Sequence, residues 1–325
     1  MATATRRVLV VGQFRSGTTW LSHIVGSPPV RYVHEPDNFR HDRLARAATQ
    51  GLGFMPSLEV GEEAPAYRRL WQLAFAGGWP DDRRVRVLRR VAASRSVPRM
   101  LRIKLALRAT RLATDVASPP PIVLVKTVFG GLSSEWLARE FDPAMLIMWR
   151  HPLNIVPAWI ERTYPAARLN SLKAIRKRFE HTEAWPPPAG EGFESTAWAA
   201  CAIGVILLEA ASRHPDWLVV SHEELCIDPP GAFRSVFARL GLSEPKDLRE
   251  RLSETDRPGA GYDIHRKTAM QPFRWRHRLQ PSDRETVISA VRRFSETSDV
   301  AASAWADSPA LYPIEEGPAG PDAEA

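Results

Sequence analysis

The sequence of 325 residues contains little cysteine, with only Cys201 and Cys226. Two cysteines exclude a disulfide framework and a cysteine-rich zinc cluster, and they favour a reducing compartment. The longest apolar runs, residues 8–11 and 202–208, are far shorter than the roughly 20 residues of a membrane-spanning helix. The short run after Arg7 leads into a glycine loop and not into a signal-peptide cleavage site. We therefore expect a cytoplasmic protein without a membrane anchor.

The excess of positive charge is confined to one segment. The chain has 44 basic and 37 acidic residues, which gives a formal net charge of +7. Residues 81–111 alone hold eleven Lys or Arg against two Asp, so the rest of the chain is slightly acidic. Such a segment attracts anions, among them nucleotides, acidic glycans, anionic lipid head groups and nucleic acid. Its interleaved apolar residues are typical of a basic amphipathic helix that covers a site or lies on an anionic membrane.

Short apolar stretches alternate with helical patterns along the chain. The stretches that predict buried strands are residues 8–11, 30–33, 122–125, 145–149 and 217–220. The patterns that predict helices are residues 20–25, 133–141, 195–212, 231–240 and 281–294. This alternation favours an α/β fold, a three-layer sandwich whose central, mainly parallel sheet is covered by helices on both faces.

We expect a single α/β domain over residues 1–307. A long insertion, residues 39–121, separates the second and third predicted strands and contains the basic segment. It ends in three prolines, residues 119–121, which form a stiff connector. We interpret this insertion as a helical lid. The tail, residues 308–325, is rich in Pro, Gly, Ala and acidic residues, and we expect it to be disordered.

The most informative segment, residues 8–21, predicts a strand, a loop and a helix in succession. Gly12 and Gly17 bracket four residues, as in the nucleotide-binding loop G-x-x-x-x-G-K-[ST]. A loop of this type directs successive backbone N–H groups at an anion, and the helix N-terminus adds a partial positive charge. The sequence therefore predicts a P-loop-like phosphate-binding loop.

This loop departs from the nucleotide-binding motif at one position. Thr18 stands where the motif has its lysine, and the cation lies earlier in the loop, as Arg15. A kinase also needs an acidic magnesium ligand at the end of a strand, whereas the later strands end in Lys126, Arg150 and Ser221. The residues thus predict a cationic site that works without a metal. Two alternatives stay open, a P-loop small-molecule kinase and a non-catalytic binder of nucleic acid or anionic membrane through residues 81–111.

Residues 14–21, Phe-Arg-Ser-Gly-Thr-Thr-Trp-Leu, resemble the 5′-phosphosulfate loop of sulfotransferases. The resemblance is to the bacterial and carbohydrate-type branch of the family. It implies 3′-phosphoadenosine 5′-phosphosulfate (PAPS) as donor, 3′-phosphoadenosine 5′-phosphate (PAP) as product, and no metal. It also implies that the loop holds the phosphosulfate and that Trp20 lies near the adenine. The donor-binding residues implied here are Arg15, Ser16, Gly17, Thr18, Thr19 and Trp20.

A second segment, residues 145–159, resembles the 3′-phosphate segment of the same family. In that segment a strand ends in Arg, and a Ser follows eight residues later. Arg150 fits the pattern, while Ala158 stands in the place of the Ser. The resemblance implies that Arg150, with Asn154, binds the 3′-phosphate of the donor.

Three later segments carry a weaker resemblance to the family. His222 takes the position of a Tyr in the family's segment near the adenine. Arg266 and Lys267 match its late Arg-Lys segment at the 3′-phosphate, although Thr268 replaces the Gly that usually follows. Residues 273–279 resemble its C-terminal basic segment with a central Trp.

Sulfuryl transfer to a hydroxyl releases a proton, so the site needs a base. Small-molecule sulfotransferases use a His two residues after a strand-ending Lys, but Val128 occupies that position here. Glu35 resembles the acid of a Glu-Pro element in bacterial and carbohydrate sulfotransferases, which implies that it is the base, with His34 as the second candidate. Side chains alternate along an extended segment, so we expect one of the two to face the site and the other to point away. The resemblance also implies that Lys126 contacts the transferring group.

We interpret the chain as a PAPS-dependent sulfotransferase that moves a sulfuryl group to a hydroxyl or amine by in-line, metal-independent transfer. Arg15, Lys126 and Glu35, or His34 in place of Glu35, are its predicted catalytic residues. The acceptor stays open among small molecules, glycans and lipids. We expect residues 81–111 to contact either the acceptor or an anionic membrane, and we expect no nucleic acid as partner.

Overall fold

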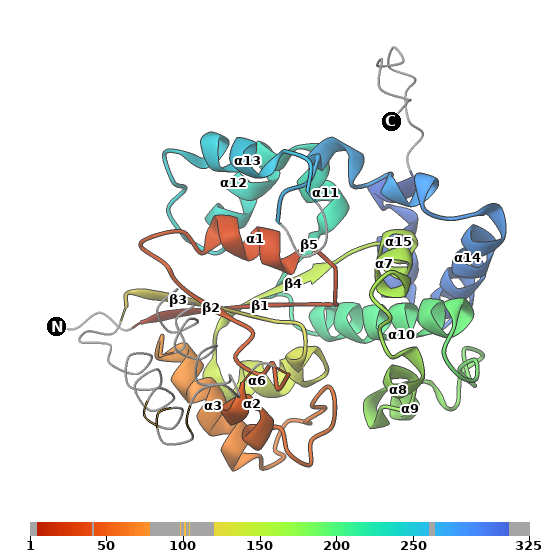
Figure 1. Ribbon diagram of the computed structural model, residues 1–325, viewed down its shortest axis with the longest axis horizontal. Helices are drawn as coiled ribbons and strands as arrows, with labels where there is room; N and C mark the ends of the chain where they lie inside the picture. The colour runs from red at the N-terminus through yellow and green to blue at the C-terminus, as the bar shows by residue number, and fades with distance from the viewer. Residues whose placement is uncertain are drawn as a thin grey trace.

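The computed structural model describes residues 5–40, 42–78, 120–259 and 264–311, together with Pro98, Leu101 and Lys104 singly. At its centre five strands form an all-parallel sheet in the order β2-β3-β1-β4-β5 (Figure 1). The strands are β1 (Arg6–Gly12), β2 (Arg31–His34), β3 (Ile122–Thr127), β4 (Ala144–Trp149) and β5 (Leu218–Ser221). All five predicted strands are confirmed, and β1 and β3 are longer than the sequence pattern indicated.

Alternate residues of the central strand β1 pack into two separate cores. Val8 and Val10 belong to the core with α1 (Thr18–Val25) and α12 (Pro229–Arg239). Leu9 and Val11 belong to the core with α3 (Pro65–Phe75) and α10 (Phe193–Ser212). All four side chains are fully buried, because helices cover both faces of the sheet (Figure 1). The predicted three-layer α/β sandwich is therefore confirmed.

The remaining helices extend the two outer layers. Beside α1 and α12 lie α11 (His222–Ile227) and α13 (Leu248–Thr255) (Figure 1). Beside α3 and α10 lie α6 (Ser134–Phe141) and α7 (Pro152–Ile160), while α14 (Pro281–Ser295) and α15 (Asp299–Ala306) pack against α10. The shorter elements are α2 (Arg43–Ala48), α8 (Ala166–Asn170), α9 (Lys173–Phe179), η1 (Gly130–Ser133), η2 (Thr268–Met270), η3 (Arg274–His277) and η4 (Pro309–Leu311). All five predicted helices are present.

The helix α10 is long and apolar enough to cross a membrane by length and composition alone. In the structure, however, 83% of its most apolar stretch is buried inside the domain. It packs against α7, α14 and α15, and its side chains form the centre of the larger core. It therefore has the surroundings of an interior helix of a globular domain.

The segment expected to form a lid divides into two parts. Its first part contains α3, whose Tyr67, Leu70 and Trp71 are buried in the core beneath β3. This part belongs to the body of the domain, because an amphipathic helix that packs on a sheet face is not free to open. The basic segment, residues 81–111, lies outside the described residues apart from single positions, so its expected role as a lid or membrane contact stays a prediction.

The expected end of the domain shifts by a few residues. Pro309 and Ala310 lie in η4 and are buried, and the carbonyl of Ala310 accepts a hydrogen bond from Trp275 Nε1 at 3.0 Å. The first residues of the segment expected to be disordered therefore pack onto the domain. The rest of that segment, residues 312–325, lies outside the described residues.

The parallel arrangement brings all five strand ends to one edge of the sheet. The loop after β1 occupies the middle of this edge, because β1 is the central strand. The ends of β2 and β3 lie on one side of the loop, and the ends of β4 and β5 lie on the other. The carboxyl edge of such a sheet is where open α/β folds bind their ligands.

Candidate active site

A cavity of about 530 Å³ lies at this carboxyl edge, around the β1–α1 loop. Most of the predicted site residues line it. They are Arg15, Gly17, Thr18, Thr19, Trp20, His34, Glu35, Lys126, Arg150, His222 and Arg266. Within the described part of the chain, its wall carries eight cationic side chains and three acidic ones. The cavity therefore suits a ligand with several negative charges.

The backbone of the β1–α1 loop is left-handed at two residues. Arg15 has a φ of 65°, and Gly17, the N-cap of α1, has a φ of 91°. A Cβ on Gly17 would lie only 2.2 Å from His222 Cδ2, so this position needs glycine for space as well as for conformation. Because α1 begins at Thr18, which lines the cavity, the helix N-terminus faces the ligand space. This local geometry is that of an anion-binding site.

Arg150 follows β4 and lies beneath the loop. Its Nη1 donates to the carbonyl of Arg15 at 3.2 Å, and its Nη2 donates to the carbonyl of Gln271 at 3.4 Å. Its Nε lies 3.7 Å from Glu223 Oε1, in a buried ion pair. Burial lowers the pKa of Arg150 to about 10, which still leaves the guanidinium charged at neutral pH. Arg150 thus joins the loop to the far side of the cavity and presents a fixed positive charge there.

Trp20 and His222 form an aromatic corner of the cavity. Trp20 Nε1 donates to Thr255 Oγ1 at 3.0 Å, and its ring meets His222 and Phe233 edge-on, with centroids 6.1 and 5.1 Å apart. Burial, together with the charge of Arg150, lowers the pKa of His222 well below its ordinary value. The imidazole is therefore neutral, so this corner offers ring surfaces of weak polarity to a ligand.

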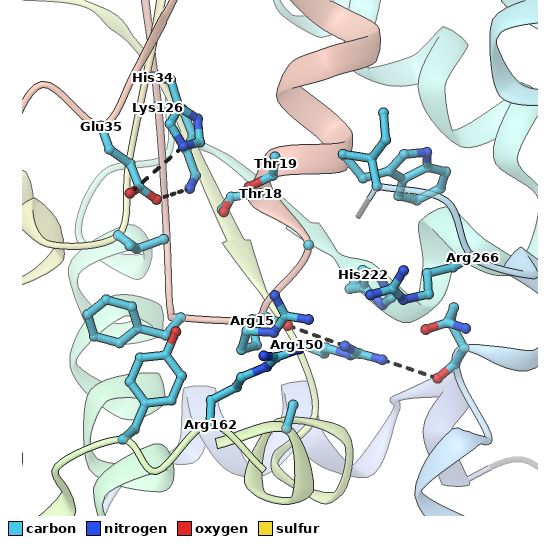
Figure 2. Close-up of a pocket in the computed structure, with 18 of the residues that line it drawn as sticks. Arg15, Thr18, Thr19, His34, Glu35, Lys126, Arg150, Arg162, His222 and Arg266 are labelled. Atoms are coloured by element: carbon cyan, nitrogen blue, oxygen red, sulfur yellow. Dashed lines mark hydrogen bonds and ion pairs between the residues drawn. The ribbon is translucent and has the colours of Figure 1, made fainter. Parts of the chain in front are cut away.

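Glu35 and Lys126 form an ion pair on the other side of the loop (Figure 2). Lys126 is 2% exposed, and Asn38 Nδ2 donates to Glu35 Oε2 at 2.8 Å. Burial alone would raise the pKa of Glu35, but the charge of Lys126 and these hydrogen bonds outweigh it and lower that pKa to about 2. His34 shares a hydrogen bond with the Tyr32 hydroxyl at 2.7 Å, and its Nε2 lies 3.9 Å from Glu35 Oε2.

Both candidate bases face the cavity, which corrects the expectation that only one would do so. The expectation assumed that the chain stays extended after β2. Glu35 instead has a φ of 43°, so the strand alternation stops there and the carboxylate turns to the same side as His34. A non-glycine residue in this conformation is strained, and such residues are common at functional sites.

Two predicted donor residues lie outside the cavity lining. Ser16 is fully buried, and its Oγ donates to the carbonyl of Gln13 at 2.8 Å, so it holds the loop in shape. Lys267 is exposed on the outer surface, where its Nζ donates to the carbonyl of Asp256 at 3.3 Å. Its neighbour Arg266 does line the cavity. The paired Arg-Lys contact expected from the sequence is thus reduced to Arg266.

Asn154 also fails to reach the cavity. It is 1% exposed, and its Nδ2 donates to Glu223 Oε1 at 2.8 Å and to the carbonyl of Pro272 at 2.9 Å. Its Oδ1 accepts from the backbone N–H of Trp275 at 3.3 Å. Asn154 therefore connects α7 to the chain at the start of η3 and to Glu223, the acid that pairs with Arg150. Its role is to position Arg150, and it does not itself contact the ligand space.

The sequence analysis assigned no role to several arginines that line the cavity. Arg162 lies in the turn that follows α7, and it lines the cavity together with Ala158 of that helix (Figure 2 labels the arginine). Arg274 and Arg278 come from the basic segment around η3, and Arg278 Nε donates to Glu161 Oε1 at 2.9 Å. No helical spacing marks Arg162 in the sequence, because α7 ends at Ile160. Arg274 and Arg278 belong to residues 273–279, a segment to which the sequence analysis assigned no role.

The acidic side chains of the cavity already have partners. Glu35 pairs with Lys126, Glu161 pairs with Arg278, and Asp42 caps α2. Within the described residues, no group of three or more His, Cys, Asp or Glu side chains could hold a metal ion. The acidic side chains of the cavity thus form ion pairs with its cations or cap a helix. The net charge of the described lining around the loop is positive.

Comparison with known proteins gives likenesses in structure alone. No family model matches the chain, and no curated protein matches it by sequence. Among solved structures, the chain is similar to the sulfotransferase domain from the Synechococcus PCC 7002 olefin synthase, with 15% identity and a TM-score of 0.43 over 90% of this chain and 96% of that one. It is also similar to the sulfotransferase domain from the curacin biosynthetic pathway, with 11% identity and a TM-score of 0.46 over 90% and 99% of the two chains.

A third similar structure is a retinol dehydratase in complex with retinol and PAP, with 14% identity and a TM-score of 0.39 over 91% of this chain and 84% of that one. At these identities the likeness concerns the fold alone. The chain thus matches solved sulfotransferase structures across most of its length, at low sequence identity.

Proposed function

We propose that this protein transfers a sulfuryl group from PAPS to a hydroxyl of an acceptor. The observation that carries the proposal is the division of one cavity by a phosphate-binding loop. Arg150 and Arg266 line one side of the loop, and the Glu35–Lys126 pair lines the other. The first side suits the 3′-phosphate of the donor, and the second suits proton removal beside a transferring group.

The donor fits the charge and shape of the cavity. A phosphomonoester carries about −1.5 to −2 charges at neutral pH, and PAPS adds a phosphosulfate to its 3′-phosphate. The excess of cationic over acidic side chains in the described wall matches such a polyanion. In the proposal, the N-terminus of α1 and Arg15 hold the phosphosulfate, Arg150 and Arg266 hold the 3′-phosphate, and Trp20 with His222 contacts the adenine.

The transfer step breaks the bond between sulfur and the 5′-phosphate oxygen as the acceptor oxygen bonds to sulfur. Negative charge then builds on the departing phosphate, and Arg15 and Lys126 stabilise it as preorganised cations. The proton of the acceptor goes to the Glu35 carboxylate, and PAP leaves with the electron pair of the broken bond. Held by Lys126, Glu35 is ionised but weakly basic. When Lys126 turns toward the sulfuryl oxygens, Glu35 loses its partner and becomes a stronger base.

The first alternative, a P-loop kinase, needs a carboxylate free to hold magnesium near Thr18. The acids in the described lining are engaged elsewhere, as Glu35 is with Lys126 and Glu161 is with Arg278. The second alternative, binding through residues 81–111, leaves the Gly17 geometry and the buried Lys126 without a purpose.

The test is a calorimetric titration of the full chain with PAP and, separately, with ADP, each with and without magnesium. We expect PAP to bind at micromolar concentration without metal and ADP to bind at least tenfold more weakly, because ADP lacks the 3′-phosphate. ADP binding that is tighter than PAP binding and depends on magnesium would move the assignment to a kinase. Binding of neither nucleotide would refute a nucleotide site.

A further inference from the structure

The cavity wall between the loop and the Glu35–Lys126 pair is apolar. Phe14, Val128, Phe129 and Tyr164 all line the cavity there. Phe14 directly precedes Arg15, and Val128 lies two residues after Lys126. A molecule that presents its oxygen to Lys126 and Glu35 must therefore lie against these side chains. We call Phe14, Val128 and Phe129 the apolar wall; the Tyr164 ring lies against Phe14 beside it and carries a hydroxyl.

The apolar wall is preformed and rigid. The Phe14 ring meets Phe129 edge-on at 5.2 Å and lies 4.9 Å from Tyr164. The backbone of Phe14 is fixed as well, because its carbonyl accepts a hydrogen bond from Trp159 Nε1 at 2.7 Å. Phe14, Val128 and Phe129 are each about 5% exposed, so only a small surface of each faces the ligand. A wall of this kind does not rearrange to offer polar contacts.

Polar groups on this side of the cavity lie at its reactive end, at its mouth and, as the Tyr164 hydroxyl, beside the apolar wall. Asn38 and Glu35 occupy the reactive end, joined by their hydrogen bond. Arg40, also in the lining, is exposed and lies over the Phe54 ring at 5.3 Å from its centroid. The side chains of Phe14, Val128 and Phe129 carry no hydrogen-bonding atom. Between its two ends, the bound acceptor therefore meets the apolar wall, with the Tyr164 hydroxyl beside it.

Resting on the function proposed above, we propose that the acceptor carries its hydroxyl on an apolar, ring-sized body and that the site rejects carbohydrates. A sugar would press hydroxyls against the apolar wall, where each loses its hydrogen bonds to water without replacement. Each such unpaired hydroxyl weakens binding by roughly tenfold or more. An apolar ring instead gains the burial of its surface against the wall.

The experiment uses the full chain saturated with PAP, titrated calorimetrically with three alcohols of similar size. They are 2-naphthol, its saturated analogue decahydro-2-naphthol, and myo-inositol. We expect both ring alcohols to bind and myo-inositol to bind at least a hundredfold more weakly. Binding of the saturated alcohol separates apolar contact from aromatic stacking. Myo-inositol binding as tight as that of the ring alcohols, or no binding of either ring alcohol, overturns the inference while PAP binding keeps the proposed function.

Variants of Val128 give a second readout. Val128→Asn should weaken ring-alcohol binding at least tenfold and change PAP affinity less than twofold, because it places an amide in the apolar wall. Val128→Ala, which adds no polar group, should weaken it only a few-fold. Val219→Asn, on a residue that is 37% exposed in β5, is the matched control and should change neither. Unchanged ring-alcohol binding in a folded Val128→Asn protein overturns the inference. Failure of the unmodified chain to bind PAP refutes the proposed function and this inference with it.

Discussion

Two carboxyl groups, separated only by Pro36, have opposite environments. Glu35 faces the cavity and pairs with Lys126, which holds its pKa near 2. Asp37 is fully buried and accepts hydrogen bonds from Thr127 Oγ1, at 2.8 Å, and from the Tyr67 hydroxyl, at 3.2 Å. The left-handed turn at Glu35 creates this separation by sending the two side chains to different compartments. In the proposed mechanism Glu35 is the proton acceptor, and the buried hydrogen bonds of Asp37 fix the chain that follows it.

Glu35→Gln should lower turnover by about 10²–10⁴-fold, the usual contribution of a general base. It should leave PAP affinity within about threefold, because Glu35 lies on the acceptor side of the loop. The measurement is transfer from labelled PAPS to a ring alcohol, with PAP titration as the binding control. His34→Gln is the matched variant at the second candidate. Loss of turnover in His34→Gln, with activity kept in Glu35→Gln, would assign the proton to the imidazole.

Arg266→Ala should weaken PAP binding by about 10–100-fold, because a charge-assisted hydrogen bond contributes roughly 1.5–3 kcal/mol. Lys267→Ala should leave it within about twofold, since Lys267 lies outside the cavity lining. The two variants remove adjacent charges of the same sign, so general electrostatic attraction cannot distinguish them. Equal losses of PAP affinity in both would mean that neither side chain contacts the 3′-phosphate directly. ADP affinity should be unchanged in both proteins.

At the scale of the elements, the β1–α1 turn depends on one glycine. An alanine at Gly17 meets two penalties, a left-handed backbone and a Cβ 2.2 Å from the His222 ring. Gly51→Ala is a matched control, because Gly51 has a similar φ of 84° and nothing near its missing Cβ. We expect Gly51→Ala to cost about 1 kcal/mol and to keep PAP affinity. Gly17→Ala should cost more and should abolish PAP binding. Urea unfolding and PAP titration measure the two effects, and equal behaviour of the variants would contradict the steric argument.

The elements that the sequence predicted correctly share a clear physical signal. Buried parallel strands are largely unbroken apolar runs, so β1, β3 and β4 stand out against the polar segments that flank them. Asp142, at the end of α6, has a φ of 46°, and the Asp-Pro pair marked that end in the sequence. The role of α3 was missed because it lies in a segment interpreted as a lid, although its spacing places Tyr67, Leu70, Trp71 and Ala74 on one face.

The site residues were predictable only where the backbone is regular. The strand ends Lys126 and Arg150 reach the cavity because parallel strands end at one edge. The prediction that His34 and Glu35 point to opposite sides was wrong. The left-handed φ of Glu35 turns its side chain, and such a φ at a non-glycine residue leaves no mark in the sequence. The positions of Asn154 and Ser16 depend on hydrogen bonds to distant or turn backbone, which spacing does not encode.

At the scale of the whole molecule, buried Asp37 makes stability depend on pH. Burial first, and then the nearby Glu35 carboxylate, raise the pKa of Asp37 to about 7 from its ordinary value of 3.8. Between about pH 4 and 7 the folded protein therefore holds a proton that the unfolded chain has released, and the resulting contribution to stability is complete only below about pH 4. The contribution is lost as the pH rises through 7. Glu35 acts in the opposite sense, since its lowered pKa contributes stability above its ordinary value of 4.5 and loses it as the pH falls toward 2.

Asp37→Asn should remove the first of these dependences. Between pH 5 and 8 the unmodified protein should lose on the order of 2–4 kcal/mol of unfolding free energy from this group, and the variant should not. The measurement is urea unfolding across that pH range. Asp216→Asn, at an exposed aspartate, is the control and should keep the full dependence. A variant that is just as sensitive to pH as the parent protein would assign the dependence to other groups.

The central place of β1 in the strand order has a consequence for how this protein can change. Under the proposed function, the nucleotide is held by residues at the ends of β4 and β5, whereas the acceptor alcohol meets residues that follow β2 and β3. The two substrates thus approach from separate halves of one sheet and meet only at the turn between them. Evolution, or a designer, can rebuild the β2 and β3 side to accept new alcohols while the other half continues to recognise the same donor. Under the proposed function, the strand order thus allows the acceptor specificity to change while the donor specificity stays the same.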